Sequence, residues 1–113
     1  MGRKSRNKGA SGERELAREL SRLFGIEAHR GCQYHGGPGS PDVAADIPDV
    51  HIECKRSERL RLYEALQQAA GDAGEKVPVV MHRQNCKPWV AIVRLDDLPR
   101  LATQIYLTLS ENG

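Results

Sequence analysis

The residues best placed for chemistry in this chain lie in one stretch, residues 39–56, with the sequence GSPDVAADIPDVHIECKR. Two short runs, residues 42–45 and 50–55, are the candidate arms of a strand pair. Between them, residues 46–49 (Asp-Ile-Pro-Asp) have the composition of a turn. The stretch is therefore predicted to fold as a β-hairpin.

Side chains on the second arm of this hairpin alternate between two faces, and the polar face carries His51, Glu53 and Lys55. If residues 46–49 form the turn, Asp42 lies directly opposite Glu53, with Cβ atoms about 4.5–5.5 Å apart. Two carboxylates that close repel each other unless a cation separates them, and hard cations such as Mg²⁺ prefer carboxylate oxygens. With Lys55 beside a bound water or phosphate, the hairpin indicates a metal-dependent hydrolytic site.

The other acidic residues of the hairpin fit this site less well. Asp49 lies four residues from Glu53 on the same strand, about 13 Å away at about 3.3 Å per residue, and Asp46 belongs to the turn. A structural interpretation also stays open, in which the polar face is solvated and Lys55 balances the acid pair. A register shifted by one residue would move Asp42 to the opposite side.

These residues resemble the signature of the PD-(D/E)XK nucleases: Pro41-Asp42, an eleven-residue step, then Glu53-Cys54-Lys55. Together with Gly12-Glu13 upstream and Gln68-Ala69 downstream, the pattern is similar to Holliday junction resolvases of archaeal and phage type, over residues 9–95. The resemblance implies an α/β (α+β) fold with a restriction-endonuclease-like core, in which helices flank a mixed central sheet.

The resemblance also implies a role for each residue of the pattern. The expected metal ion is Mg²⁺, with Mn²⁺ able to substitute, and its expected ligands are Asp42, Glu53, Glu13 and the backbone carbonyl of Cys54. Lys55 would orient the attacking water or offset charge on the transition state. Gln68 would face the active site from a helix, although Gln67 beside it is a rival for that position.

Glu13 also follows from a helix pattern. Ser11 fits the N-cap of a helix over residues 12–24, whose apolar stripe is Leu16, Ala17, Leu20, Leu23 and Phe24. Glu13 falls on that inward stripe, where an acid needs a partner because buried charge is costly. It is either a third carboxylate of the metal site or an acid that stabilises the first helical turn.

Positive charge gathers where a nucleic-acid backbone could pass. Residues 1–10 are expected to form a flexible basic arm ahead of a single nuclease domain at 11–113, and the arm carries Arg3, Lys4, Arg6 and Lys8. Arg30 and Arg56 are further candidate DNA contacts. Related resolvases carry a functional serine in a Gly-rich region that corresponds to residues 31–40, and Ser40 is its nearest match. A solubilising tail and an ordinary connecting loop are the alternatives.

The remaining pattern predicts the element order αβββαββα. Strands are expected at residues 26–30, 77–81 and 89–93, and helices at 56–73 and 96–109. The inward stripe of the helix at 56–73 is Leu62, Leu66, Ala69 and Ala73. The last helix is apolar enough to suggest a partner surface, although packing on its own sheet is the simpler interpretation.

Size and composition limit the class of protein. The 113 residues suit one domain, and 39% hydrophobic with 4% aromatic residues allow only a modest core. No apolar run approaches the roughly 20 residues of a membrane span. Three cysteines without C-x-x-C spacing favour reduced thiols in a cytosolic setting and argue against a zinc site. Together with the resemblance, this implies the cytoplasm of a bacterial, archaeal or phage-infected cell.

The leading hypothesis is a Mg²⁺-dependent endonuclease that resolves four-way (Holliday) junctions by paired hydrolysis of phosphodiester bonds. Symmetric cutting needs two active sites, so a homodimer bound to branched double-stranded DNA is expected. One alternative is a restriction-like or nicking nuclease on linear DNA. The other is a non-catalytic basic DNA-binding module, which would bind without metal and with strong salt dependence.

Overall fold

The computed structural model describes the backbone of residues 2–31 and 41–112, and the side chains of residues 10–31 and 41–111. Its elements follow in the order α1 (Gly2–Phe24), β1 (Ala28–Arg30), β2 (Val43–Ala45), β3 (Val50–Arg56), α2 (Leu62–Ala73), β4 (Val77–Arg83), β5 (Val90–Ile92), a turn of 3-10 helix η1 (Leu95–Asp97) and α3 (Leu98–Asn112). The predicted order αβββαββα and the mixed central sheet are confirmed.

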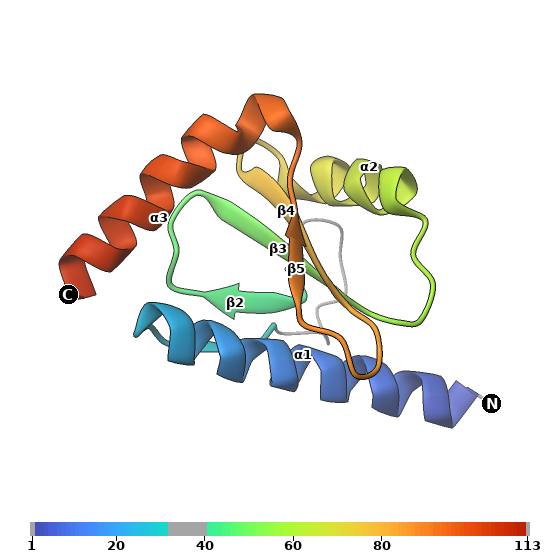
Figure 1. The fold of residues 1–113 in the computed structure, drawn as a ribbon. Helices are drawn as coiled ribbons and strands as arrows, with labels where there is room; N and C mark the ends of the chain where they lie inside the picture. The colour runs from blue at the N-terminus through green and yellow to red at the C-terminus, as the bar shows by residue number, and fades with distance from the viewer. Residues whose placement is uncertain (1, 32–40, 113) are drawn as a thin grey trace.

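The five strands form one sheet in the order β1-β2-β3-β4-β5 (Figure 1). Three pairs are antiparallel, and β3 and β4 pair in parallel at its centre. A parallel pair needs a crossover, and α2 supplies it. The helices α1 and α3 lie on one face of the sheet, and α2 covers the other.

The predicted hairpin register is confirmed. Val43 of β2 pairs with Ile52 of β3, which is the register that places Asp42 opposite Glu53. The backbone N–H of Asp42 donates to the carbonyl of Ile52 at 3.1 Å, so the pairing continues past the end of β2. In the turn, Asp49 has a φ of 67°, a left-handed conformation that Asp tolerates better than most residues.

Each helix buries an apolar stripe against the sheet. On one face, α1 packs against β2 and β3 through Leu16, Ala17, Leu20, Val43 and Ile52. On the opposite face, α2 packs on Val80 of β4 through Ala65, Leu66 and Ala69. Ile52 faces α1 while its neighbour Glu53 faces α2, since successive strand residues point to opposite faces. The alternation of β3 thus gives a core face and a polar face beneath α2.

A close approach of α1 to β3 depends on Gly12. A Cβ at this position would lie 2.5 Å from the Cβ of Arg56, closer than two such atoms ever come. The absence of a side chain at Gly12 lets the helix backbone reach the strand and sets the position of neighbouring Glu13.

The largest differences from the predicted boundaries are at the starts of two helices. The helix predicted to begin after Ser11 begins at Gly2, so the segment expected to be a flexible arm is helical from Gly2 on. Residues 2–10 hold no proline, and extending an existing helix adds one hydrogen bond for each residue fixed. The helix predicted from residue 56 begins at Leu62, because β3 continues to Arg56 in parallel pairing with β4.

The buried stripe of α2 also differs from the prediction. Leu62 at its first position is 39% exposed, and Ala65 is buried in its place.

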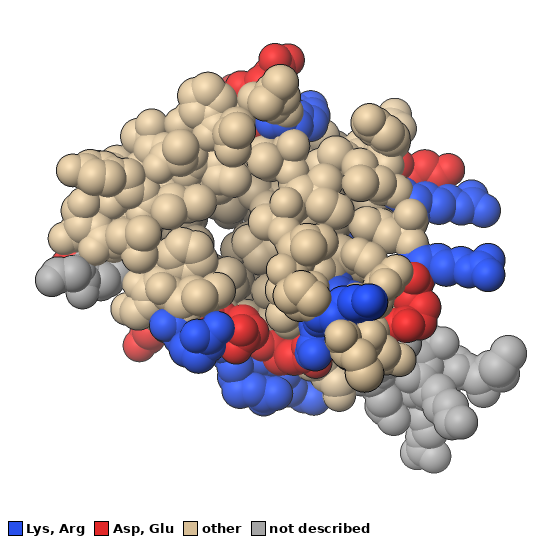
Figure 2. Space-filling view, viewed as in Figure 1, with Lys and Arg blue, Asp and Glu red and all other residues tan. Residues whose placement is uncertain are grey.

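In α3, Leu101 packs on Val77 and Val79 of β4, so part of this helix packs on its own sheet, as the simpler interpretation expected. Other apolar side chains of α3 are exposed: Leu98, Tyr106, Leu107 and Leu109. Figure 2 shows that the surface over α3 and β5 carries few charges, whereas Lys, Arg, Asp and Glu line α1. Within residues 2–31 and 41–112, no helix has the length and apolar character that a membrane crossing requires.

Candidate active site

The polar face of β3 lies beneath α2, and the start of β2 borders it. His51, Glu53 and Lys55 share this face, as the sequence predicted. From α2, Gln68 and Asp72 lie over the same strand, one helical turn apart. The site is therefore lined by a strand on one side and by one face of a helix on the other.

Asp42 lies directly before β2 and is held in place by a hydrogen bond. Its Oδ2 accepts a hydrogen bond of 2.9 Å from the backbone N–H of Cys54, one residue beyond Glu53. Burial, a hydrogen bond with Glu53 and the charges of Glu53 and Glu13 raise the pKa of Asp42 to about 7. Below that pH, Asp42 carries a proton that it can donate to the Glu53 carboxylate.

Glu53 shows the opposite shift. Burial by itself would raise the pKa of Glu53, but hydrogen bonds from His51 and Asp42 and the charges of His51 and Lys55 outweigh it, so the pKa is lowered. The pair therefore consists of one carboxylate that holds a proton and one that stays ionised. Such a pair is a suitable donor set for a hard divalent cation, because the cation can replace the shared proton.

Glu13 lies close to this pair but is held by Arg30. The Nε of Arg30 donates to Oε1 of Glu13 at 2.6 Å, and the Glu13 side chain is only 13% exposed. Its charge contributes to the raised pKa of Asp42, which shows that the two acids share one electrostatic environment. The position of Glu13 agrees with the prediction, and its role as a metal ligand stays a prediction.

Lys55 and Gln68 meet across the site. The Nζ of Lys55 lies 3.4 Å from Oε1 of Gln68, which selects Gln68 over its neighbour for the position facing β3. Gln67 instead lines a separate cavity of about 520 Å³ between α2 and the segment that follows β5. The choice that the sequence left open is decided by the rotation of α2 about its axis.

Cys54 can serve the site only through its backbone. Burial and the charges of Asp42, Glu13 and Glu15 raise the pKa of its thiol to about 12, so the sulfur stays protonated. Its N–H already binds Asp42, which leaves its carbonyl as the predicted ligand.

The predicted DNA-binding residues have varied positions. Arg30 pairs with Glu13. Arg56 is largely buried and contacts Glu15 and the carbonyl of Arg83. Ser40 lies outside the described residues, and so do the side chains of four residues on α1: Arg3, Lys4, Arg6 and Lys8. DNA binding by each of them stays a prediction.

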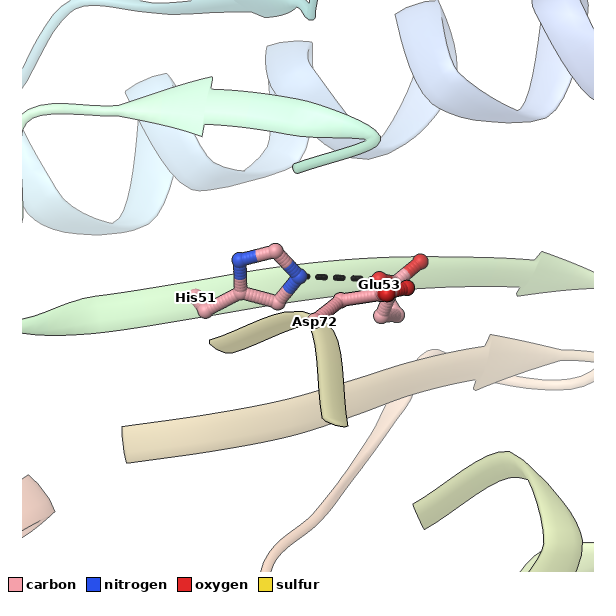
Figure 3. Close-up of side chains that lie close together, drawn as sticks. All are labelled: His51, Glu53 and Asp72. Atoms are coloured by element: carbon pink, nitrogen blue, oxygen red, sulfur yellow. Dashed lines mark hydrogen bonds and ion pairs between the residues drawn. The ribbon is translucent and has the colours of Figure 1, made fainter. Parts of the chain in front are cut away.

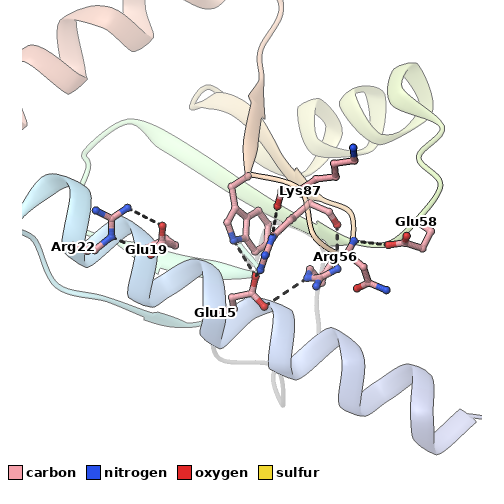
Figure 4. A network of polar contacts seen from close by, with 9 residues as sticks. Glu15, Glu19, Arg22, Arg56, Glu58 and Lys87 are labelled. Atoms are coloured by element: carbon pink, nitrogen blue, oxygen red, sulfur yellow. Dashed lines mark hydrogen bonds and ion pairs between the residues drawn. The ribbon is translucent and has the colours of Figure 1, made fainter.

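A polar network ties α1 to the β4–β5 hairpin (Figure 4). Glu15 on α1 accepts hydrogen bonds from Arg83 of β4 and, at 3.1 Å, from the indole N–H of Trp89, and it also pairs with Arg56 at 3.6 Å. Burial would raise the pKa of Glu15, but the two arginines outweigh it and lower the pKa. Arg83 is thus engaged within the protein.

Two residues beside Glu53 were not predicted from the sequence as parts of the site, His51 and Asp72. The ligand atoms of His51, Glu53 and Asp72 all lie within 4.8 Å of one another (Figure 3). His51 has the same strand parity as Glu53, and Asp72 follows Gln68 by four residues, so both spacings were available as signals.

The chain is similar to known proteins in sequence and in fold. The family model described as "Phage putative PDDEXK endonuclease" matches residues 4–111. Among solved structures, the chain is similar to Hjc of Archaeoglobus fulgidus, a Holliday junction resolvase from an archaeal hyperthermophile. The TM-score is 0.56 and the identity 24%, over 76% of this chain and 72% of that chain, a likeness that concerns the fold.

No curated protein sequence matches this chain. The family model, by contrast, spans nearly the whole of it, including both acids of the β2–β3 hairpin, Lys55 and the facing helix α2. The chain therefore belongs to the phage PDDEXK endonuclease family.

Proposed function

We propose that this chain is a Mg²⁺-dependent endonuclease that resolves four-way DNA junctions by paired hydrolysis of phosphodiester bonds. The observation that carries the proposal is the facing pair of Asp42 and Glu53 on the β2–β3 hairpin, with Lys55 on the same strand face. The choice of a branched substrate is supported by the likeness of the fold to Hjc, a Holliday junction resolvase.

The cation would be held by the carboxylates of Asp42 and Glu53, with Glu13 and the backbone carbonyl of Cys54 as further ligands. When bound, it would polarise a phosphoryl oxygen and lower the pKa of water. Asp42 would lose its proton to make room for it. The burial of Glu53 keeps bulk water from competing for its oxygens.

Lys55 supplies the positive charge of the chain at this site. Its ammonium group, placed by the contact with Gln68, would hold the attacking water or offset charge that develops on the phosphoryl oxygens. Arg59 and Arg61 follow β3 and are exposed, so they add positive charge on the path that a DNA backbone would take.

Two strands of a junction must be cut symmetrically, so the active form would be a homodimer with two such sites. Basic side chains at Arg3, Lys4, Arg6 and Lys8 would contact DNA phosphates, and Arg30, Ser40 and Arg56 are the other proposed DNA contacts. The protein would act in the cytoplasm of a bacterial, archaeal or phage-infected cell.

The test compares a labelled synthetic four-way junction with a linear duplex of the same sequence, each with Mg²⁺, Mn²⁺ or EDTA. The variant Asp42→Asn removes a metal ligand, and Asp46→Asn, an exposed acid of the turn, is its matched control. Paired nicks in the junction alone, lost with EDTA and in Asp42→Asn but kept in Asp46→Asn, are expected. Equal cutting of both DNAs would contradict junction specificity, and binding without cutting in any metal would contradict catalysis.

A further inference from the structure

Behind the acid pair lies a second polar contact, more deeply buried than the first. Nε2 of His51 is 2.8 Å from Oε1 of Glu53, and the two residues are 2% and 4% exposed. Asp72 reaches the same place from α2, and Figure 3 shows its carboxylate beside that of Glu53. These three residues come from two elements on opposite sides of the site.

The hydrogen bond between His51 and Glu53 defines which atom donates. A carboxylate that is ionised can only accept, so the nitrogen that faces it must carry the proton. Glu53 is therefore bound through Oε1 by an N–H group of its own strand. The hydrogen bond keeps the Glu53 carboxylate from rotating about its last side-chain bond. One of its oxygens is then bound to His51, and the other is available.

The charge balance explains why this contact matters. The carboxylates of Glu53 and Asp72 lie within 4.8 Å of each other and of the imidazole of His51. Two carboxylates that close repel each other, and the hydrogen bond from the imidazole N–H to Glu53 offsets part of that repulsion.

We propose that His51 is a positioning residue of the nuclease site: its Nε2–H holds Oε1 of Glu53, so that the other oxygen is available to the cation beside Asp42. This inference rests on the proposed function, because it concerns the metal site of that nuclease. Hydrogen-bond partners of ligating groups set the orientation and basicity of those ligands, and losing one lowers metal affinity or activity by about 10–100-fold.

The test is built on two variants that differ by one methylene group. The amide of His51→Gln can place its N–H close to where Nε2 lies, whereas that of His51→Asn is too short to reach Oε1. His51→Leu removes the donor altogether. An exposed histidine, His29, provides the control His29→Leu. Thermal unfolding first shows which variants are folded, and a non-folding His51→Leu leaves the Gln and Asn pair to decide.

The readout is calorimetric titration of the DNA-free protein with Mn²⁺, which requires no cleavage. The wild-type chain and His29→Leu are expected to bind with equal affinity. His51→Leu and His51→Asn are expected to bind about 10–100-fold more weakly with the same stoichiometry, and His51→Gln to recover most of the affinity. Asp72→Asn is expected to weaken binding less than His51→Leu, because it leaves the hydrogen bond between His51 and Glu53 in place.

Three results would overturn the inference. They are unchanged Mn²⁺ affinity in folded His51→Asn, no Mn²⁺ binding by the wild-type chain, and the loss of one bound ion per chain while the other ion keeps its affinity. The last result would make His51 a ligand of a second cation. Failure of the proposed function is distinguishable, because a wild-type chain that binds Mn²⁺ but cuts no DNA still reports on His51.

Discussion

Asp42 and Glu53 meet across the β2–β3 hairpin with opposite shifts in pKa. The pKa of Asp42 rises from 3.8 to about 7, chiefly because the carboxyl is buried and bonds to Glu53. Glu53 stays ionised because His51 and Asp42 donate to it. At the scale of single residues, the folded chain is thus less stable when both of these carboxyl groups are charged.

This pair predicts how stability without metal depends on pH. Asp42 holds its proton up to about pH 7 in the folded chain and only up to about 3.8 when unfolded, so its contribution to stability is lost as the pH rises through about 7. In EDTA, the melting temperature is expected to fall as the pH rises from about 3.8 to about 7 and to level off above that, and Asp42→Asn is expected to reduce that fall. Thermal unfolding followed by circular dichroism measures both.

Mg²⁺ provides the complementary check. A cation bound between the acids relieves their repulsion, so Mg²⁺ is expected to raise the melting temperature of the wild-type chain more at the higher pH. An equal fall with pH in the wild-type chain and in Asp42→Asn would show that other groups determine it.

At the scale of elements, the site depends on the contact between the end of β1 and the start of β2. The N–H of Gly31 donates to the carbonyl of Asp42 at 2.8 Å, directly after β1. A Cβ on Gly31 would lie 2.1 Å from the carbonyl oxygen of Pro41 and 3.3 Å from the carbonyl carbon of Asp42. Both are backbone atoms, so no side chain can rotate to make room.

Gly31→Ala is therefore expected to displace Pro41 and Asp42. We expect a loss of about 1–3 kcal/mol in the free energy of unfolding, together with weaker Mn²⁺ binding. Gly71→Ala is the matched control, because nothing lies within 4 Å of its Cβ and the residue is in α2. The control is expected to gain about 0.5–1 kcal/mol, since Ala favours the helix over Gly. Denaturant unfolding measures both, and equal effects would contradict the steric argument.

A second connection between elements runs through Glu15. Glu15→Gln weakens its bonds to Arg83 and Arg56 and is expected to lower the free energy of unfolding by about 1 kcal/mol at neutral pH. Because the pKa of Glu15 is lowered in the folded chain, this difference is expected to disappear as the pH falls through that pKa. The exposed pair of Glu19 and Arg22 is the control, and Glu19→Gln is expected to change nothing measurable. Denaturant unfolding at neutral and acidic pH would show a constant difference if the carboxylate were not responsible.

At the scale of the whole molecule, each chain has one Asp42–Glu53 pair, whereas resolving a junction requires two cuts. A homodimer is therefore expected to sediment as twice the mass of the chain, and mixed dimers can separate the two cuts. When wild-type chains are mixed with Asp42→Asn chains, mixed dimers are expected to nick one strand of a junction. Paired cuts by the mixed dimers would contradict this assembly. Sedimentation of the protein only as a monomer would contradict it as well.

Patterns of residues close together in the sequence were sufficient to predict the order of the elements and the pairing of the hairpin. The element order followed from apolar periodicity, and the pairing of Asp42 with Glu53 followed from a turn of four residues and the two-residue period of a strand. Both depend only on residues close together in the chain. The starts of α1 and α2 were missed, because helix elongation extended α1 toward the N-terminus and pairing with β4 kept Arg56 in β3.

Only the tertiary structure decided which distant residues complete the site. Each residue turns a helix by about 100°, so the face that α2 presents to β3 depends on how Ala65, Leu66 and Ala69 pack on Val80. That packing brings Gln68 to Lys55 and Asp72 to His51 and Glu53, and turns Gln67 away. The sequence could name the acids of the hairpin, whereas the partners that hold them are set by the rotation of a helix on a sheet.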